Sequence, residues 1–171
     1  PKDQVLNNFR DMTLYADKIV GRIVSTLEKN GLRENTIVMY TADNGTHRSL
    51  RYPFRKEIRQ GEKAYATDGG SHAPLIINCP GTVPPDIVSD DLVDFSDFMP
   101  TIAEITGARL PEVTLDGRSF WPQCLGKKGN PRRWIFQYYI RDSYNQYGKK
   151  PQNQINVPSI AKLDGKQNNP T

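Results

Sequence analysis

The sequence has few of the features that would assign the protein to a class at once. It contains only two cysteines, Cys79 and Cys124, which allow one disulfide bond or none and leave the redox compartment undecided. No apolar run approaches the length of a membrane-spanning helix, and the opening residues PKDQVLNN do not predict a secretory signal peptide. We therefore expect no membrane span in this chain.

A basic stripe with interleaved aromatic residues is also absent. The net charge is +4, but the positive residues are scattered in short clusters such as the one at 48–51. This distribution disfavours nucleic-acid binding and is more typical of a general preference for anionic ligands. Hydrophobic residues make up 36% of the chain and charged residues 25%, which indicates a globular protein long enough to form a core.

The order of the apolar segments predicts a layered α/β fold. Apolar residues recur at helical spacing over residues 5–27, and a second helix is expected over 94–106. Three short runs rich in β-branched or aromatic residues are typical of strands covered on both faces, at 36–41, 74–78 and 134–139. We therefore expect part of a mixed, mostly parallel sheet flanked by helices.

The segments between and after these elements differ in character. Residues 43–73 are polar and rich in glycine and charge, which predicts a long functional or mobile loop with little regular structure. Residues 142–171 are rich in Asn, Gln, Lys and Pro, and predict a polar, weakly ordered tail. We therefore divide the chain into a portion of a domain at 1–141 and a tail at 142–171.

The strand expected at 36–41 ends in the tripeptide Asp43-Asn44-Gly45. The carboxylate and the amide offer hard oxygen ligands of the kind that Ca²⁺ or Mg²⁺ takes, and Gly45 lets the backbone turn so that both could meet one ion. The same three residues are also a common turn composition. On these residues alone, a plain turn and half of a metal site both remain open.

Features further along the chain bear on this choice. Lys63 follows about twenty residues after Asp43, and a segment of glycines and Pro74 then leads into the next strand, which Pro80-Gly81 closes. In this order and spacing the chain resembles the sulfatase family of the bacterial arylsulfatase type, within the alkaline-phosphatase-like superfamily. The resemblance covers roughly residues 14–139 and continues through 92–101, 116–120 and 133–136.

The resemblance implies a role for particular residues. Asp43 and Asn44 are similar to two ligands of the family's divalent ion, usually Ca²⁺ with Mg²⁺ as the alternative, and Lys63 to the catalytic lysine that binds the sulfate group. His47 and His72 flank this region and are candidate substrate contacts, with exposed loop histidines as the plainer alternative. The expected substrate is an aryl or carbohydrate sulfate ester, and the expected location is periplasmic or secreted.

The family also needs components that these residues do not supply. Calcium takes six to eight oxygens, so Asp43 and Asn44 do not fill its shell. The nucleophile is a formylglycine made from a Cys or Ser in a Cys/Ser-x-Pro/Ala-x-Arg motif, and neither Cys79 nor Cys124 stands in one. We therefore expect the carboxyl-terminal portion of a sulfatase, inactive alone, with the formylglycine in an amino-terminal half.

Two alternatives remain at this stage. A phosphoesterase of the same superfamily would use a similar site, although such enzymes often carry histidine where this chain has Asn44, and asparagine favours a single hard ion. A non-catalytic module that binds sulfated glycans would explain the missing nucleophile. Comparing the hydrolysis of sulfate and phosphate esters by the complete protein separates the phosphoesterase alternative from the sulfatase prediction.

Overall fold

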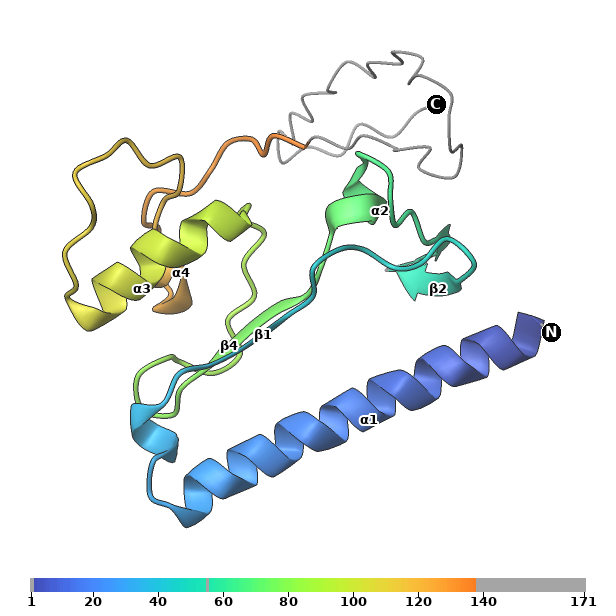
Figure 1. Ribbon diagram of the computed structural model, residues 1–171, viewed down its shortest axis with the longest axis horizontal. Coiled ribbons are helices and arrows are strands. Elements are labelled where there is room, and N and C mark those ends of the chain that lie inside the picture. The colour runs from blue at the N-terminus through green and yellow to red at the C-terminus, as the bar shows by residue number, and fades with distance from the viewer. Residues whose placement is uncertain (1, 55, 138–171) are drawn as a thin grey trace, which may run out of the picture.

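The computed structural model describes residues 2–54 and 56–137. Its helices are α1 (Lys2–Lys29), α2 (Asp68–Ser71), α3 (Phe98–Thr106) and α4 (Trp121–Cys124), with 3₁₀ turns η1 (Arg33–Asn35) and η2 (Phe95–Asp97). Its strands are β1 (Val38–Thr41), β2 (Arg51–Phe54), β3 (Glu57–Gln60) and β4 (Leu75–Asn78). In Figure 1, α1 extends along one side of the paired β1 and β4 strands, and α3 and α4 lie together on the other.

The sheet differs from the mostly parallel one that we expected. β1 pairs with β4 in antiparallel register, with Val38 opposite Asn78, and β2 pairs with β3 in a separate antiparallel pair. The apolar content of a strand does not specify its direction. Parallel strands need a crossover connection, whereas the chain between β1 and β4 forms a hairpin and a short helix and then returns alongside β1. Among the described residues the fold is α/β with two small antiparallel sheets.

Some of the other predicted elements are confirmed by the structure and others are not. Both predicted helices are confirmed, as α1 and as η2 with α3, and Gly107 ends α3 in a left-handed conformation at φ 70°. The segment at 43–73 is more regular than expected, because it contains β2, β3 and α2. The described part of the expected strand at 134–139 forms no regular strand, and the predicted tail at 142–171 lies outside the described residues.

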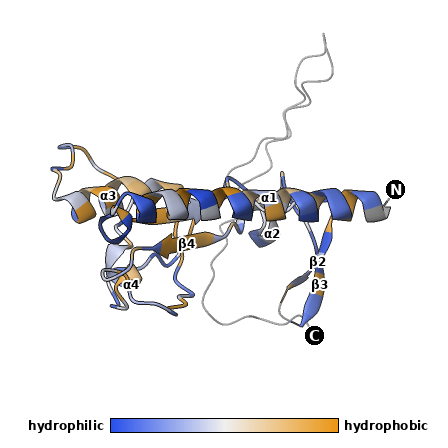
Figure 2. Ribbon diagram, turned by 90° about the horizontal axis from the view of Figure 1, so that it is seen from below, coloured by the Kyte–Doolittle hydropathy of each residue, from blue (hydrophilic) through white to orange (hydrophobic). Residues whose placement is uncertain are grey.

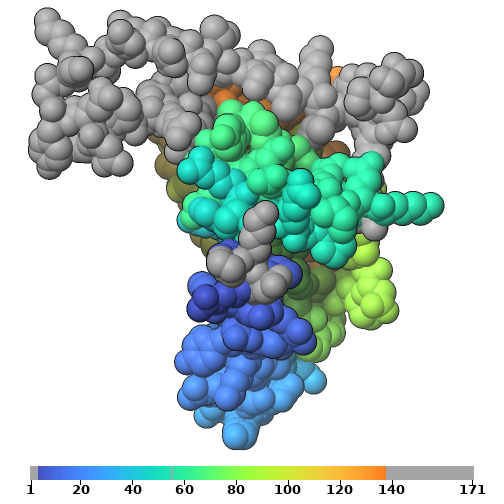
Figure 3. All heavy atoms as spheres, turned by 90° about the vertical axis from the view of Figure 1, so that its right-hand side faces the viewer, coloured from blue at the N-terminus to red at the C-terminus, as the bar shows by residue number. Residues whose placement is uncertain are grey.

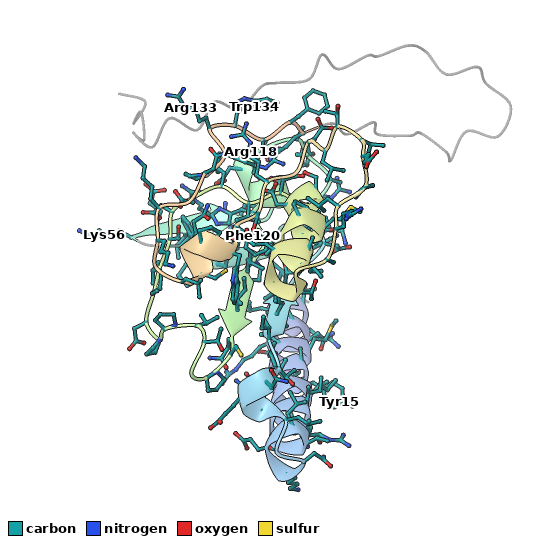
Figure 4. All side chains as sticks on the ribbon, turned by 90° about the vertical axis from the view of Figure 1, so that its left-hand side faces the viewer. Tyr15, Lys56, Arg118, Phe120, Arg133 and Trp134 are labelled. Atoms are coloured by element: carbon teal, nitrogen blue, oxygen red, sulfur yellow. The ribbon has the colours of Figure 1, made fainter. Side chains whose placement is uncertain are left out.

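Helix α1 leaves much of its apolar surface in contact with solvent. Its charged residues recur along its length, and within the described part of the chain no helix has both the length and the apolar character needed to cross a bilayer. Figure 2 shows hydrophobic residues along α1 and on β4, and Figure 4 shows Tyr15 pointing away from the body of the molecule. The exposed large apolar residues of α1 are Val5, Leu6, Phe9, Met12, Leu14, Tyr15, Ile19 and Ile23.

A buried polar cluster joins α3 to two segments that follow it. The carboxylate of Asp97, a residue only 1% exposed, accepts hydrogen bonds from Asp94 N at 2.8 Å, from Arg118 N at 2.6 Å, and from Arg132 Nε and Nη2 at 2.6 Å each. Thr101, fully buried, donates to Asp97 O at 2.6 Å and accepts from the backbone N–H of a neighbouring segment. Every buried polar atom of Asp97 and Thr101 thus has a partner, as a buried network requires.

The ionisation of this cluster follows from its contacts. Burial alone would raise the pKa of Asp97, but hydrogen bonds from the Arg132 side chain and from the backbone of Arg118 and Asp94, together with the charge of Arg132, lower it below its ordinary value of 3.8. The same pairing raises the pKa of Arg132. The cluster is therefore ionised at neutral pH. The cluster also holds the next segment in place, because Phe120 N donates a hydrogen bond to the Thr101 hydroxyl. The side chain of Phe120 lies between α3 and α4 (Figure 4).

Candidate functional site

The turn that follows β1 packs directly against a glycine pair. Gly45 N donates to Gly70 O at 2.8 Å, and a Cβ built on Gly45 would lie 2.0 Å from Gly69 O. No real Cβ tolerates that distance, so only glycine lets the two backbones come this close. The glycines that the sequence places at 45 and at 69–70 therefore meet in space, which fixes the end of β1 against α2.

The loop that carries Lys63 folds back onto the same turn. Lys63 N donates to Thr46 O at 3.0 Å, and Gly61 N donates to Leu50 O at 2.9 Å. A Cβ on Gly61 would lie 2.3 Å from the carbonyl oxygen of His47. The backbone of Lys63 therefore lies beside the residue two positions after Asn44. Its side chain is exposed, and no hydrogen bond or ion pair joins the ammonium to another described residue.

Asp43 and Asn44 have oxygens available for a ligand. Asp43 is exposed, with no hydrogen bond or ion pair to another described residue, and Asn44 is half-buried. The Asn44 amide donates through Nδ2 to Gly45 O at 3.2 Å, which leaves its Oδ1 as an acceptor. These oxygens fit a hard divalent cation. The described residues contain no group of three or more His, Cys, Asp or Glu that could hold a metal, so they supply only part of a shell.

The two histidines lie in different surroundings. His47 takes part in a local turn, with Nδ1 at 2.8 Å from Ser49 Oγ and accepting from Ser49 N at 3.2 Å. His72 lies with Nδ1 at 3.3 Å from Asp68 Oδ1, and its ring meets the edge of Phe54 at 5.9 Å between centroids. Both are exposed. Only His72 therefore belongs to a cluster of ionisable groups.

A small pocket adjoins the turn on the side of the β2–β3 hairpin. Its volume is about 120 Å³, and it is lined by Thr46, Tyr52, Phe54, Arg59, Asp68, Gly69 and His72. We did not predict Arg59 and Phe54 from the sequence, because they lie on strands within a segment expected to be loop. The alternation of aromatic with other residues along Arg51–Phe54 is a sequence signal for β2 that could have found Phe54, whereas no such alternation marks Arg59. A wider hollow of about 540 Å³ beside α3 has one ionisable side chain in its lining, Glu104.

The cysteines are placed as structural residues. Cys79 is 2% exposed and its Sγ lies 3.4 Å from Glu34 O, just past the end of β4. Cys124 lies in α4, and burial raises the pKa of its thiol. Both are free thiols. Neither lies among the residues that form the turn, the Lys63 loop or the pocket.

Comparison with known proteins identifies a family. The sequence model described as "Sulfatase" matches residues 1–108. Arylsulfatase A of Homo sapiens is 37% identical over 132 residues, covering 76% of this chain and 26% of that protein. Steryl-sulfatase of Rattus norvegicus is 30% identical over 87% of this chain and 27% of its own length, and an uncharacterized sulfatase of Escherichia coli (strain K12) is 32% identical over 79% and 25%. The chain thus spans about a quarter of the length of these relatives.

Proposed function

This chain belongs to the sulfatase family, and from that premise we propose that it forms part of a sulfuric ester hydrolase. In this proposal Asp43 and Asn44 are two ligands of a calcium ion, with magnesium as the alternative, and Lys63 binds the sulfate group of the substrate. The observation that carries it is the hydrogen bond from Lys63 N to Thr46 O, which holds the lysine beside the Asp43-Asn44 turn.

The chemistry of sulfate ester cleavage explains why these residue types belong together. Negative charge must be stabilised on the sulfate oxygens as the S–O bond breaks, and a positioned ammonium such as that of Lys63 supplies part of that stabilisation. When bound, a divalent cation supplies electrophilic charge to the same oxygens. Asp43 and Asn44 would hold it through their side-chain oxygens. No described residue forms an ion pair with Lys63, so its full charge is available to the substrate.

We propose that the remaining parts of the site come from polypeptide outside this sequence, and that the chain alone has no turnover. Two oxygens leave most of a calcium shell to other ligands. The buried Cys79 is inaccessible to a substrate, and neither cysteine stands in a formylglycine motif. The match covers only 26% of the length of human arylsulfatase A, and the apolar residues of α1 are exposed. Both observations support a contribution from further polypeptide. An exported, periplasmic or secreted location goes with this proposal.

The test uses the complete protein with matched lysine variants. Lys63→Ala should lower kcat/KM for a nitrophenyl sulfate by at least about a hundredfold, the cost of losing one electrostatic stabiliser of the transition state. Lys56→Ala, at an exposed lysine that points away from the molecule in Figure 4, should leave the rate unchanged. Near-normal activity of Lys63→Ala would refute the assigned role, and faster cleavage of a phosphate ester would favour the phosphoesterase alternative.

The metal assignment has a separate measurement. Asp43→Ala should weaken calcium binding, measured by titration calorimetry on the chelator-treated protein, by about tenfold or more because a charged ligand is lost. Asp90→Ala removes an exposed carboxylate of a different loop and should bind calcium like the unmodified protein. Equal affinities in the two variants would show that Asp43 is not a ligand.

A further inference from the structure

The pocket of about 120 Å³ beside the turn is built from three segments of the chain. Thr46 comes from the turn after β1, Tyr52, Phe54 and Arg59 come from the β2–β3 hairpin, and the remaining lining comes from 68–72. Figure 3 shows the hairpin and the segment that follows it on one continuous face of the molecule. Ligand pockets for drug-sized molecules are usually about 300–1,000 Å³. This pocket therefore suits one ring of a substrate rather than a whole ligand.

The polar side chains of the pocket position one another. Arg59 Nη1 lies 3.4 Å from Asp68 Oδ2, and His72 Nδ1 lies 3.3 Å from Asp68 Oδ1. The guanidinium of Arg59 also stacks over the ring of Phe54, with Cζ 4.5 Å from the centroid. Donors from Arg59 and His72 and acceptors from Asp68 thus line a small volume beside the ring of Phe54, one face of which Arg59 covers. This combination matches a ring with several hydroxyl groups.

The charges that line the pocket determine whether a bound ring is neutral or anionic. Among the described residues that line the pocket, Arg59 is the only arginine. It pairs with Asp68 at 3.4 Å and lies 3.9 Å from a second carboxylate, that of Glu57. No described lysine or arginine of the lining is therefore left over to balance a carboxylate or a second sulfate on the ligand, and His72 already faces Asp68. The carboxylates of Asp68 and Glu57 would repel a further anion at this short range, so the pocket favours a neutral ring.

The pocket adjoins the turn and the loop that carry the proposed sulfate site. Thr46 lines the pocket and accepts the hydrogen bond from Lys63 N, and Gly69 lines the pocket and packs against Gly45. We propose that this pocket is the subsite for the group to which the sulfate is attached, and that it takes a single neutral sugar ring. The inference rests on the proposed function. It names the substrate as a monosulfated neutral sugar in preference to a sulfated uronic acid or a simple aryl sulfate.

The first experiment compares two arginine variants of the complete protein. Arg59→Leu removes the guanidinium donors of the pocket, and Arg51→Leu changes an exposed arginine of the same hairpin that does not line it. With a hexose monosulfate, Arg59→Leu should raise KM by about tenfold with a smaller change in kcat, since it removes binding to the bound ring. With a nitrophenyl sulfate, which has no hydroxyl groups, it should change KM less than twofold. Arg51→Leu should change neither.

The second experiment reverses the charge preference. Asp68→Asn keeps the size of the side chain but leaves Arg59 without its main counter-charge. The ratio of kcat/KM for a sulfated uronic acid to that for the neutral hexose sulfate should rise several-fold in Asp68→Asn. Unchanged melting temperatures show that both variants are folded. An unchanged ratio, or equal effects of Arg59→Leu on sugar and aryl substrates, would overturn the subsite.

A binding measurement separates this inference from the proposed function. Lys63→Ala should still bind the unsulfated hexose, detected by saturation-transfer NMR, and the added Arg59→Leu change should abolish the signal. This result together with no sulfate hydrolysis by the unmodified protein would refute the function and retain the subsite. Hydrolysis that depends on Lys63, with hexose binding insensitive to Arg59→Leu, would retain the function and refute the subsite.

Discussion

Replacing Arg132 with methionine should destabilise the protein through the charge that it leaves behind. Arg132 donates two hydrogen bonds to Asp97, one to Asp116 O at 2.9 Å and one to Ser96 Oγ at 2.8 Å. Methionine retains much of the apolar stem but none of these donors. The Asp97 carboxylate then remains in a site where the residue is 1% exposed, with only two backbone N–H groups as partners.

The size of the effect follows from the burial of the pair. Removing one partner of a buried ion pair costs about 3–5 kcal/mol, and the two remaining backbone donors place the expected loss near the lower end, about 3 kcal/mol. With a urea dependence of about 1–3 kcal/mol per molar, the denaturation midpoint should fall by about 1–3 M. The exposed neighbour Arg133 provides the control, and Arg133→Met should change stability by no more than about 0.5 kcal/mol.

The assay is urea denaturation of the complete protein at neutral pH, followed by circular dichroism. A midpoint for Arg132→Met equal to that of Arg133→Met would refute the reasoning. Asp97→Asn should also be destabilising, because its amide N–H groups face the donors of Arg132. The double variant Asp97→Asn/Arg132→Met should lose less stability than the sum of the two single losses, since both break the same interaction.

The same pair predicts a dependence on acid. Because the pKa of Asp97 is lower in the folded state than its ordinary value of 3.8, the unfolded state binds the proton first as the pH falls. The stabilisation is fully present above the unfolded pKa and is lost as the pH falls through the folded pKa. Below about pH 4, the unmodified protein should therefore lose stability more steeply with pH than Asp97→Asn, measured as urea midpoints across the acid range. Parallel curves would contradict this assignment.

Two further predictions concern close packing and a buried hydroxyl. Gly45→Ala should lower the free energy of unfolding by about 1–3 kcal/mol, because its Cβ would meet Gly69 O at 2.0 Å. Gly21→Ala in α1 meets nothing within 4 Å and should raise it by up to about 1 kcal/mol. Thermal denaturation that ranks these variants the other way would contradict the packing. Thr101→Val leaves a backbone N–H without its acceptor and should cost about 1–3 kcal/mol, whereas Thr106→Val at an exposed helix position should cost less; equal urea midpoints would show that the hydroxyl does not matter.

The candidate site was partly predictable because some of its signals are local. The turn at Asp43 and its glycine follow directly on an apolar strand, and the lysine loop keeps a recognisable order of residues. Arg59 was missed because the hairpin that carries it lies in a segment dominated by polar residues and glycine. Its position matters only once the segment folds back, and its partner Asp68 lies nine residues further along the chain.

By itself the sequence determined the helices α1 and α3, the strand segments at β1 and β4, the turn that follows β1, and the family. Each of these depends on periodicity, on residue type or on a fixed order along the chain. The tertiary structure alone decided the antiparallel pairing, the assembly of Arg59 with Asp68 and His72, and the pairing of Asp97 with Arg132, which lies 35 residues away. The physical reason is that strand direction and long-range ion pairs depend on how the connecting segments fold back. No local pattern of residues specifies that path.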